Sequence, residues 1–363
     1  MNLKGIAKYS LNIFRILVFF LFFSTFSITF ASEMQDKSKY RYTYIDNISG
    51  ILILDMVFIV HVCPNCNIHN NYTYYIWLLF CYFMPWFFFK SGMFYKPNTI
   101  PLSNGINKLV IPYIFFSFFG LVLHLAFELY VKSTPLSTIL INIKEDVIYR
   151  GGIDWNLALW FLISLFAVRI ITPILNKILP ISFILILSVL ISWGANYFKL
   201  TYPVWIGNIA LGIIFYTMGY LLRVIQYNKS IFYISLLLFL CGFFLPIITK
   251  FDFRCNQIGV TDNYLVVMLY CTSGIITINN IAFKFFNKPI TIITNIGKNS
   301  IILYVIHFPI IMLCTNIIKS TTITNPYYIF IIVSISIIIT YSFAVYILQQ
   351  SDKLGFMIGR KTS

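Results

Sequence analysis

The chain has 363 residues, of which 59% are hydrophobic, 19% are aromatic and only 10% are charged. A soluble globular domain carries about 25% charged residues, and a hydrophobic excess along the whole length cannot be buried in one aqueous core. The formal net charge of +15 comes from basic residues scattered over many loops, which fits anionic lipid and excludes a nucleic-acid-binding module. The composition therefore predicts an all-α protein that is integral to a lipid bilayer.

The first element in chain order is an apolar stretch at residues 16–31, which follows Lys4, Lys8 and Arg15. Its small residues near position 31 resemble a signal-peptidase site. A cleaved signal, an additional span and an interfacial helix are all compatible with this pattern, so its fate and orientation stay open. We treat residues 1–40 as a separate hydrophobic segment that ends in a basic linker.

Ten further apolar segments follow, and each is close to the roughly 20 residues that a transmembrane helix needs. They predict a polytopic helical bundle of about ten core spans, at residues 45–62, 75–95, 109–131, 156–175, 178–198, 203–222, 230–250, 264–283, 296–315 and 326–349. We find no internal repeat, no P-loop and no glycine-rich dinucleotide fingerprint. The sequence therefore predicts a single membrane domain without a soluble catalytic module.

The basic residues of the loops predict how these spans are oriented. If Asp46 begins on the cytoplasmic side, the inside loops hold twice as many lysines and arginines as the outside loops. We then expect a multi-pass protein of the cell membrane with its C-terminus, including a basic tail at 351–363, in the cytoplasm. The longest predicted outside loop, 132–155, is too short to form a domain.

The end of the first span, "IVHVCPNCNIH" at residues 59–69, contains two histidines and two cysteines. Four ligands from so short a run would force the backbone to wrap one ion tightly, and Pro64 stiffens the chain, so we expect no metal. A disulfide between Cys63 and Cys66 fits an oxidising compartment, and whether they are bridged stays open. His61 is the stronger candidate, because ionisable groups inside membranes are costly and often functional. A histidine satisfied by water at the headgroup level is the alternative.

Polar residues also interrupt the ninth span, "IGKNSIILYVIHFPI" at residues 296–310. Spacings of three, four and seven place Ser300, Tyr304 and His307 on one face of a helix. A polar stripe on an otherwise apolar helix should face protein or a water-filled cavity. We assign no catalytic role to two other histidines, His124 and His69.

These motifs, in this order, resemble the acyltransferase-3 membrane family, and most closely its fucose 4-O-acetylase-like branch. The resemblance covers residues 41–350. It rests on "YIDNISGILILDMVFIVH" (44–61), "FMPWFFFKSGMFYK" (83–96), "LWFLISLF" (159–166) and the ninth-span motif, with support from "GYLLR" (219–223). It implies a membrane O-acyltransferase, by default an O-acetyltransferase, that uses acyl-CoA or acetyl-CoA. The implied acceptor is a hydroxyl of a cell-envelope polysaccharide or of its lipid-linked precursor.

The resemblance implies that His61 is catalytic. A positioned histidine can remove the hydroxyl proton as the oxygen attacks the thioester carbonyl. The oxyanion then needs a hydrogen-bond donor, for which Ser91, Tyr304 and Ser300 are candidates together with Asn299. We place His307 in the same catalytic set because it shares the polar face of the ninth span.

Coenzyme A carries several phosphate charges, and basic groups near the expected inner mouth can neutralise them. The predicted cofactor-binding residues are Arg41, Lys90, Lys96, Arg223, Lys298, Asn299 and Ser300. For each basic residue taken alone, positive-inside topology is a sufficient explanation. The expected partners are acyl-CoA, an envelope glycan and the bilayer, while the oligomeric state cannot be read.

The sequence departs from the family pattern at three positions. The family often has arginine or lysine where Ser49 stands, and a histidine where Phe83 follows Tyr82. The family interval from the first of these positions to the histidine is eleven residues, whereas Ser49 and His61 are twelve apart. One added residue would rotate His61 by about 100° on a regular α-helix.

The main alternative function is transport, by a polysaccharide flippase or another secondary carrier. Ten spans with polar residues inside the membrane fit such a protein as well. Many carriers are built from paired repeats with helices broken at matching positions, and the chain shows no such duplication. Acyl transfer is therefore the preferred interpretation.

Overall fold

The computed structural model describes residues 42–97, 99–198, 200, 203–249, 264–319, 321–350 and 355–358. Helices make up nearly all of this part of the chain, and it contains no strand. Among the described residues, seven helical segments are long and apolar enough to cross a membrane, and three apolar helices are shorter. The prediction of an all-α polytopic bundle is confirmed. The N-terminal segment 1–40 and most of the basic tail lie outside the described residues.

Each of the ten predicted spans corresponds to one main helix or to a pair of consecutive helices. They are α2 (Thr43–Leu54) with η1 (Asp55–Val62), α4 (Asn71–Phe80) with α5 (Phe83–Met93), α7 (Ile111–Tyr130), α9 (Trp160–Leu175), α10 (Ile181–Tyr197), α11 (Val204–Leu222), α12 (Lys229–Thr249), α13 (Tyr264–Phe285), α15 (Ser300–Lys319) and α16 (Pro326–Gln350). Shorter elements connect or extend them: α3 (Cys63–Asn65), α6 (Leu102–Gly105), η2 (Ile106–Val110), α8 (Leu136–Glu145), η3 (Asp146–Arg150), η4 (Asp154–Leu159), η5 (Ile225–Tyr227), α14 (Thr291–Lys298) and η6 (Phe356–Ile358).

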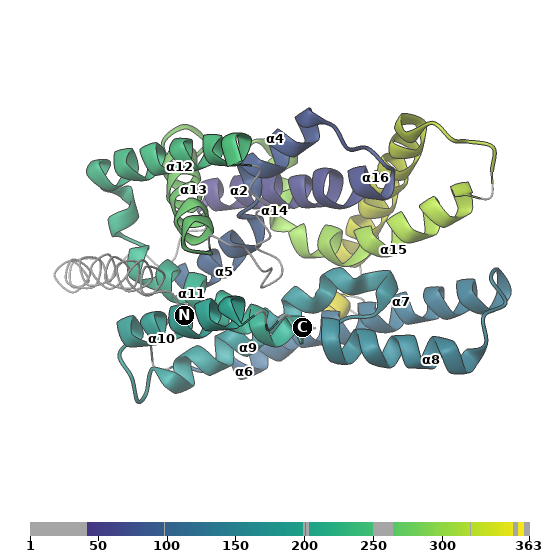
Figure 1. Ribbon diagram of the computed structural model, residues 1–363, viewed down its shortest axis with the longest axis horizontal. Coiled ribbons are helices and arrows are strands. Elements are labelled where there is room, and N and C mark those ends of the chain that lie inside the picture. The colour runs from purple at the N-terminus through teal and green to yellow at the C-terminus, as the bar shows by residue number, and fades with distance from the viewer. Residues whose placement is uncertain are drawn as a thin grey trace, which may run out of the picture.

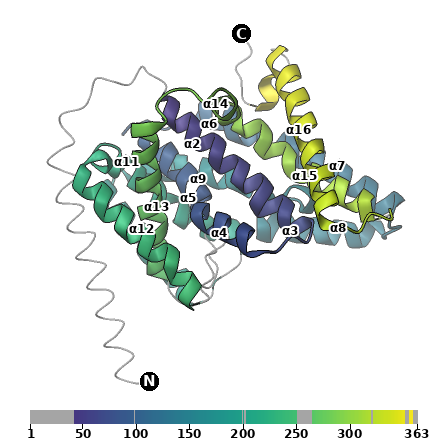
Figure 2. The ribbon, with the colours of Figure 1, turned by 90° about the horizontal axis from the view of Figure 1, so that it is seen from above.

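The first helix of the bundle, α2, lies at its centre. In Figure 1, α2 and α12 to α16 occupy one half of the molecule, and α7 to α11 occupy the other. In Figure 2, α12 and α13 flank α2 on one side, while α15 and α16 lie on the other side. The side chains of Ile48 and Leu52 are fully buried. The helix that carries His61 is therefore surrounded by protein along much of its length.

The structure differs from the predicted spans where the backbone breaks. The expected outside loop 132–155 contains α8 and η3, which return alongside α7 (Figure 1). The fourth span begins at Trp160 rather than at 156, because η4 interposes a short 3-10 segment with non-helical angles at Asn156. The ninth span begins at Ser300, because residues 291–298 form the separate helix α14. Apolar composition alone does not reveal such breaks.

Glycines allow α2 and α14 to pack with their backbones in contact. A Cβ atom on Gly297 would overlap the carbonyl oxygen of Asp46, and one on Gly50 would overlap that of Ile293. The fully buried Asn47 ties the same end of α2 to the connection before α14, since its amide donates to the carbonyl oxygens of Phe286 and Lys288. This close packing determines where the ninth span begins.

Replacing Gly297 by alanine should therefore destabilise the protein. The added methyl group must push α14 away from α2, and overpacking of this kind costs about 1–3 kcal/mol. The matched control is Gly194→Ala in α10, where a Cβ atom meets nothing within 4 Å and alanine favours the helix. Thermal unfolding in lipid nanodiscs, followed by tryptophan fluorescence, should show a lower midpoint for Gly297→Ala only. Equal midpoints for both variants would contradict the packing argument.

Candidate functional site

Two histidines from distant parts of the chain meet inside the bundle. His61 lies in η1 and His307 lies in α15, and the Nδ1 atom of His61 is 2.9 Å from the Nε2 atom of His307. Their ring planes differ by 19° and the ring centroids are 5.0 Å apart. His307 is fully buried, whereas His61 keeps part of its surface accessible. The structure thus pairs one fully buried imidazole with one that is only partly buried.

The surroundings of His307 determine the protonation pattern of the pair. The Nδ1 atom of His307 is 2.7 Å from the carbonyl oxygen of Tyr304 and 3.2 Å from that of Leu303. Carbonyl oxygens only accept, so this nitrogen carries the proton and, in neutral His307, Nε2 is the acceptor. The Nδ1–H group of His61 therefore donates to His307. The Nε2 atom of neutral His61 is left with a free lone pair, which is the chemical requirement for a base.

A π-helix brings His61 to this position. The eight residues of η1, Asp55–Val62, form a π-helix, and the N–H group of Cys63 donates to the carbonyl oxygen of Phe58, five residues earlier. Such a turn holds about one residue more than an α-turn, and π-bulges are frequent at functional sites. The twelve-residue interval between Ser49 and His61 would misdirect the histidine on a regular helix. The π-helix takes up the additional residue, so His61 faces α15.

Asp55 lies in the same π-helix as His61, but it does not hold the Nδ1 atom of His61. His307 takes the Nδ1–H group of His61. The carboxyl group of Asp55 is buried, and neither of its oxygens has a hydrogen-bond partner among the residues that the structure describes. The orienting group is therefore a second histidine, which sequence spacing did not connect with His61.

Tyr304 contributes its backbone rather than its hydroxyl group to the histidine pair. The hydroxyl group donates to the carbonyl oxygen of Ala158 in η4, while the backbone carbonyl accepts from His307. The ring of Tyr304 lies 6.0 Å from that of His307, so the two residues share a helix face as expected. The use of the Tyr304 hydroxyl as an oxyanion donor stays a prediction, and in the structure its proton is directed at the carbonyl oxygen of Ala158.

Asn156 is a site residue that sequence reasoning missed. Pro309 lies inside α15 and has no N–H group, so it cannot bond to the carbonyl of Val305 four residues earlier. The side-chain amide of Asn156 donates to that carbonyl oxygen at 3.1 Å and also to the carbonyl of Phe116 in α7. A proline in the span was the available signal, because the carbonyl it frees needs a donor from elsewhere.

A second polar group lies far from the histidines. The ammonium group of Lys90 in α5 donates to the Ser49 hydroxyl at 2.7 Å and lies 5.4 Å from the ring of Trp86. Lys90 thus places a cation at the α2 position where the family often has arginine or lysine. Twelve residues separate Ser49 from His61, or about 18 Å along a helix. Ser91 follows Lys90 directly in α5, and its catalytic role stays a prediction.

The remaining predicted cofactor-binding residues fall into two places. Lys298, Asn299 and Ser300 lie where α14 meets α15, beside the Gly50–Gly297 contact, and Lys298 is exposed. Arg223 ends α11 and stacks over Tyr220, whose ring packs against Tyr95 at the end of α5. Exposed Lys96 follows Tyr95 directly. Arg41 lies outside the described residues.

Cys63 and Cys66 are both buried free thiols in the structure. Among the described residues, no three histidine, cysteine or acidic side chains are grouped so as to hold a metal ion. Burial, with a smaller contribution from the charge of Cys63, raises the pKa of Cys66 to about 11. The thiol is therefore protonated near neutral pH and is a poor nucleophile.

Comparison with known proteins identifies one relationship. A family model described as an acyltransferase domain, of the acyltransferase-3 type, matches residues 42–345. The match covers both histidines, the Lys90 group and every span from α2 to α15. No curated protein and no solved structure matches the chain.

The raised pKa of Cys66 predicts slow alkylation. With a pKa of about 11, the reactive thiolate is scarce at pH 7.5 and increases as the pH rises. A water-soluble maleimide should label Cys66 far more slowly in the native protein than in the chain denatured in SDS, as measured by peptide mass spectrometry. Labelling of both forms at the same rate would contradict the buried, protonated thiol.

Proposed function

The chain belongs to the acyltransferase-3 family, and from this premise we propose that it is a membrane O-acyltransferase that uses an acyl-CoA donor. The family membership establishes acyl transfer and a multi-pass membrane protein. The donor, most simply acetyl-CoA, and the acceptor, a hydroxyl of an envelope polysaccharide or its lipid-linked precursor, are the proposal. The observation that carries it is the histidine pair, in which the Nδ1–H group of neutral His61 donates to His307 and the Nε2 atom of His61 keeps a free lone pair.

In the proposed reaction, His61 acts as the general base. A sugar hydroxyl is a poor nucleophile near neutral pH, and a positioned histidine accelerates such steps by about 10²–10⁴-fold. The Nε2 atom takes the hydroxyl proton while the oxygen bonds to the thioester carbonyl carbon. The carbon–sulfur bond then breaks, and the thiolate of coenzyme A takes the proton back from His61. An ester and a free thiol are formed with no change in oxidation state.

His307 acts as a positioning residue for this base. It accepts the Nδ1–H group of His61 and so selects the tautomer with the lone pair on Nε2. When His61 becomes an imidazolium, the bond to His307 becomes charge-assisted and therefore stronger. The carbonyl oxygens behind His307 increase the electron density on its accepting nitrogen. The same buried pair thus stabilises the charge that develops during proton transfer.

The distance between the Lys90 group and His61 supports an extended donor. A phosphate group beside the Lys90 ammonium would lie about 18 Å along α2 from the base. This separation suits coenzyme A, whose pantetheine arm separates its phosphates from the thioester. Lys298 and the α14–α15 junction lie beside the same end of α2 and add positive charge there. In this arrangement the donor extends along α2 and presents its thioester to His61.

Analysis of the envelope polysaccharide discriminates between this proposal and a carrier. A strain that lacks the protein should still export its polysaccharide but lose the ester signals in its NMR spectrum. Mild base should remove the same signals from the wild-type glycan. Accumulation of glycan that is not exported, with ester groups retained, would favour a flippase instead.

Replacing His61 by alanine should abolish acyl transfer while the protein still inserts and folds. The expected loss is about 10²–10⁴-fold in kcat, because the base is removed. Membranes supplied with radiolabelled acetyl-CoA and the envelope glycan provide the assay. The double variant Cys63→Ser, Cys66→Ser is the matched control, since it changes the same helix end and should retain activity. Full activity in His61→Ala would remove this residue from the mechanism.

Variants of His307 test its positioning role. His307→Leu removes the acceptor for the Nδ1–H group of His61, so kcat should fall and the pH dependence of kcat/KM should change. His307→Gln retains an oxygen that can accept this proton and should recover part of the rate. The KM for acetyl-CoA should stay near the wild-type value in both variants. Equal losses in both, with an unchanged pH profile, would indicate a merely structural role.

Replacing Lys90 by methionine should weaken the donor. The change removes a cation beside the proposed phosphate position, and a charge-assisted hydrogen bond is worth about 1.5–3 kcal/mol. We therefore expect a rise in the KM for acetyl-CoA of at least about tenfold, with a smaller effect on the acceptor. Lys284→Met is the control, because Lys284 is an exposed residue that stacks over Phe285. The same KM in both variants would place the donor elsewhere.

A further inference from the structure

One face of α7 carries polar groups along much of its length. Ser117, Gly120, His124 and Glu128 are spaced by three, four and four residues, so they share this face. Ser117 is 9% exposed and His124 is 6% exposed. Polar groups buried within a transmembrane helix face protein or a water-filled cavity and are seldom retained without a role. The histidine pair does not account for these groups, so we expect this face of α7 to have a function of its own.

The segment that packs against this face is η4, the short helix before α9. A Cβ atom on Gly120 would lie 3.1 Å from the Cβ atom of Asn156. The ring of His124 is 6.2 Å from that of Trp155. The amide of Asn156 also donates to the carbonyl of Phe116, one turn before Gly120. Asn156 and His124 therefore meet the same buried region between α7 and η4.

Buried polar atoms on both sides of this region lack hydrogen-bond partners within the described part of the chain. Among the described residues, nothing bonds to the Nδ1 atom of His124 or to the Oδ1 atom of Asn156. Asn156 is fully buried, and its amide nitrogen is satisfied on the other side by backbone carbonyls. Buried polar atoms are paired in the great majority of cases. Two unpaired atoms on facing elements thus indicate a place for a polar ligand.

The backbone at this place is irregular well inside the bundle. Gly151 has a φ of 77°, and Asn156 has φ −150° and ψ 45°. Phe116 and Gly120, which contact Asn156, lie about 15–21 Å along α7 from its end at Tyr130. Irregular backbone at membrane depth occurs where it is enclosed by protein or lines a cavity. Broken helices of this kind form the binding sites of many membrane proteins.

The segment η4 also contacts α15, the helix that carries His307. Asn156 donates to the carbonyl of Val305, two residues before His307. The hydroxyl group of Tyr304 donates to the carbonyl of Ala158. A ligand between α7 and η4 is therefore one helix turn of α15 away from the histidines. The unpaired atoms and the proposed base belong to neighbouring parts of one region.

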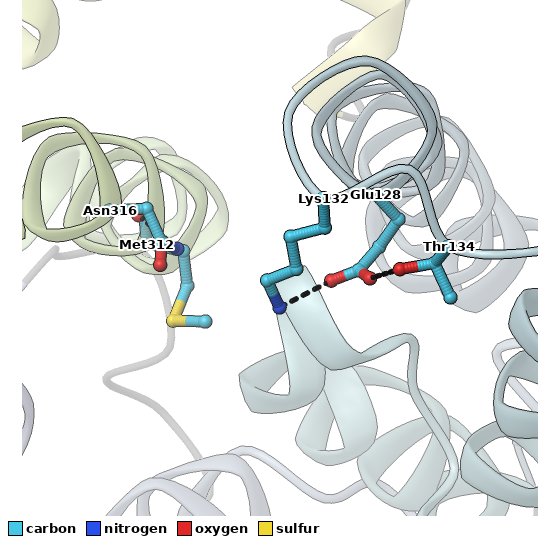
Figure 3. A network of polar contacts seen from close by, with 5 residues as sticks. All are labelled: Glu128, Lys132, Thr134, Met312 and Asn316. Carbon is cyan, nitrogen blue, oxygen red and sulfur yellow. Dashed lines mark hydrogen bonds and ion pairs between the residues drawn. The ribbon is translucent and has the colours of Figure 1, made fainter. Parts of the chain in front are cut away.

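Polar groups continue from this region to the end of α7. Glu128 accepts hydrogen bonds from Lys132 and Thr134, each at 2.7 Å. Figure 3 shows this cluster at the turn after α7, with Met312 and Asn316 of α15 across from Lys132. Glu128 lies one turn beyond His124 on the same face. The polar face thus leads from the end of the helix down to Asn156.

We propose that the polar face of α7 and the break at η4 form the acceptor subsite, which binds a neutral, hydroxyl-rich group such as a sugar ring. The proposal rests on the acyl transfer proposed above. The Oδ1 atom of Asn156 only accepts, so its partner is a hydrogen-bond donor, such as a hydroxyl, and not an ionised phosphate or carboxylate oxygen. A second hydroxyl pairs with the Nδ1 atom of His124. Another hydroxyl of the same acceptor then reaches the Nε2 atom of His61.

His124→Phe tests this assignment, because it removes Nδ1 and retains an aromatic ring against Trp155. The protein in nanodiscs is supplied with radiolabelled acetyl-CoA and a panel of methyl hexopyranosides as acceptor probes. Loss of one hydrogen bond should raise the acceptor KM by about tenfold and leave the acetyl-CoA KM unchanged. His124→Asn, which retains a polar atom near the Nδ1 position, should recover part of the loss. The matched control is His69→Phe, since His69 lies in an exposed loop.

The outcomes separate this proposal from the proposed function. A wild-type acceptor KM in His124→Phe would overturn the subsite and mean that water occupies it. If the wild-type protein transfers no acetyl group to any hydroxyl, the proposed function fails. Whether the subsite binds a glycoside is then tested by a binding measurement without catalysis. In that case, saturable quenching of tryptophan fluorescence by the glycosides, lost in His124→Phe and retained in His69→Phe, supports it. Absence of quenching in the wild-type protein overturns it.

Discussion

A single hydrogen bond between two imidazole rings organises the centre of this protein. Because the backbone carbonyls of Tyr304 and Leu303 hold the Nδ1–H group of His307, its other nitrogen can only accept, and His61 must donate. The free lone pair on the Nε2 atom of His61 follows from this direction of hydrogen bonding. The π-helix of η1, the enclosed position of α2 and the placement of α15 all serve to bring these two rings together. In many hydrolases a carboxylate has this orienting role. Here a neutral histidine has it, which avoids burying a negative charge beside the base.

Breaks in the helices supply the polar groups that a bundle of regular helices would hide. Pro309 frees a carbonyl of α15, and the amide of Asn156 satisfies it from a segment that is itself not helical. The amide oxygen of Asn156 then remains unpaired beside His124. In a membrane, where water is scarce, each such compensation must come from the protein. The helix breaks, the proposed acceptor subsite and the histidine pair are for this reason close together.

The proposed position of the donor phosphates and the proposed base lie at opposite ends of the first span, which consists of α2 and η1. The end that contacts α14 is held by glycine contacts and by Asn47, and Lys90 brings a cation to Ser49. The other end continues into η1, which carries His61, the proposed base. A donor that extends from one end to the other, and an acceptor that approaches along α7, would meet at His61 from different directions. In the proposed arrangement, a charged donor and a neutral glycan would use one site without sharing a binding surface.

The sequence by itself determined the class of the protein, its ten apolar segments and the family to which it belongs. It also pointed to His61 and His307, because an isolated ionisable residue is conspicuous in an apolar helix. It did not place the breaks at η4 and between α14 and α15, since apolar composition is the same on either side of them. Only the tertiary structure decided that His61 pairs with His307, that a π-helix carries His61, and that Lys90 lies beside Ser49. Those outcomes depend on hydrogen bonds between residues as far as 246 positions apart, which no local pattern contains.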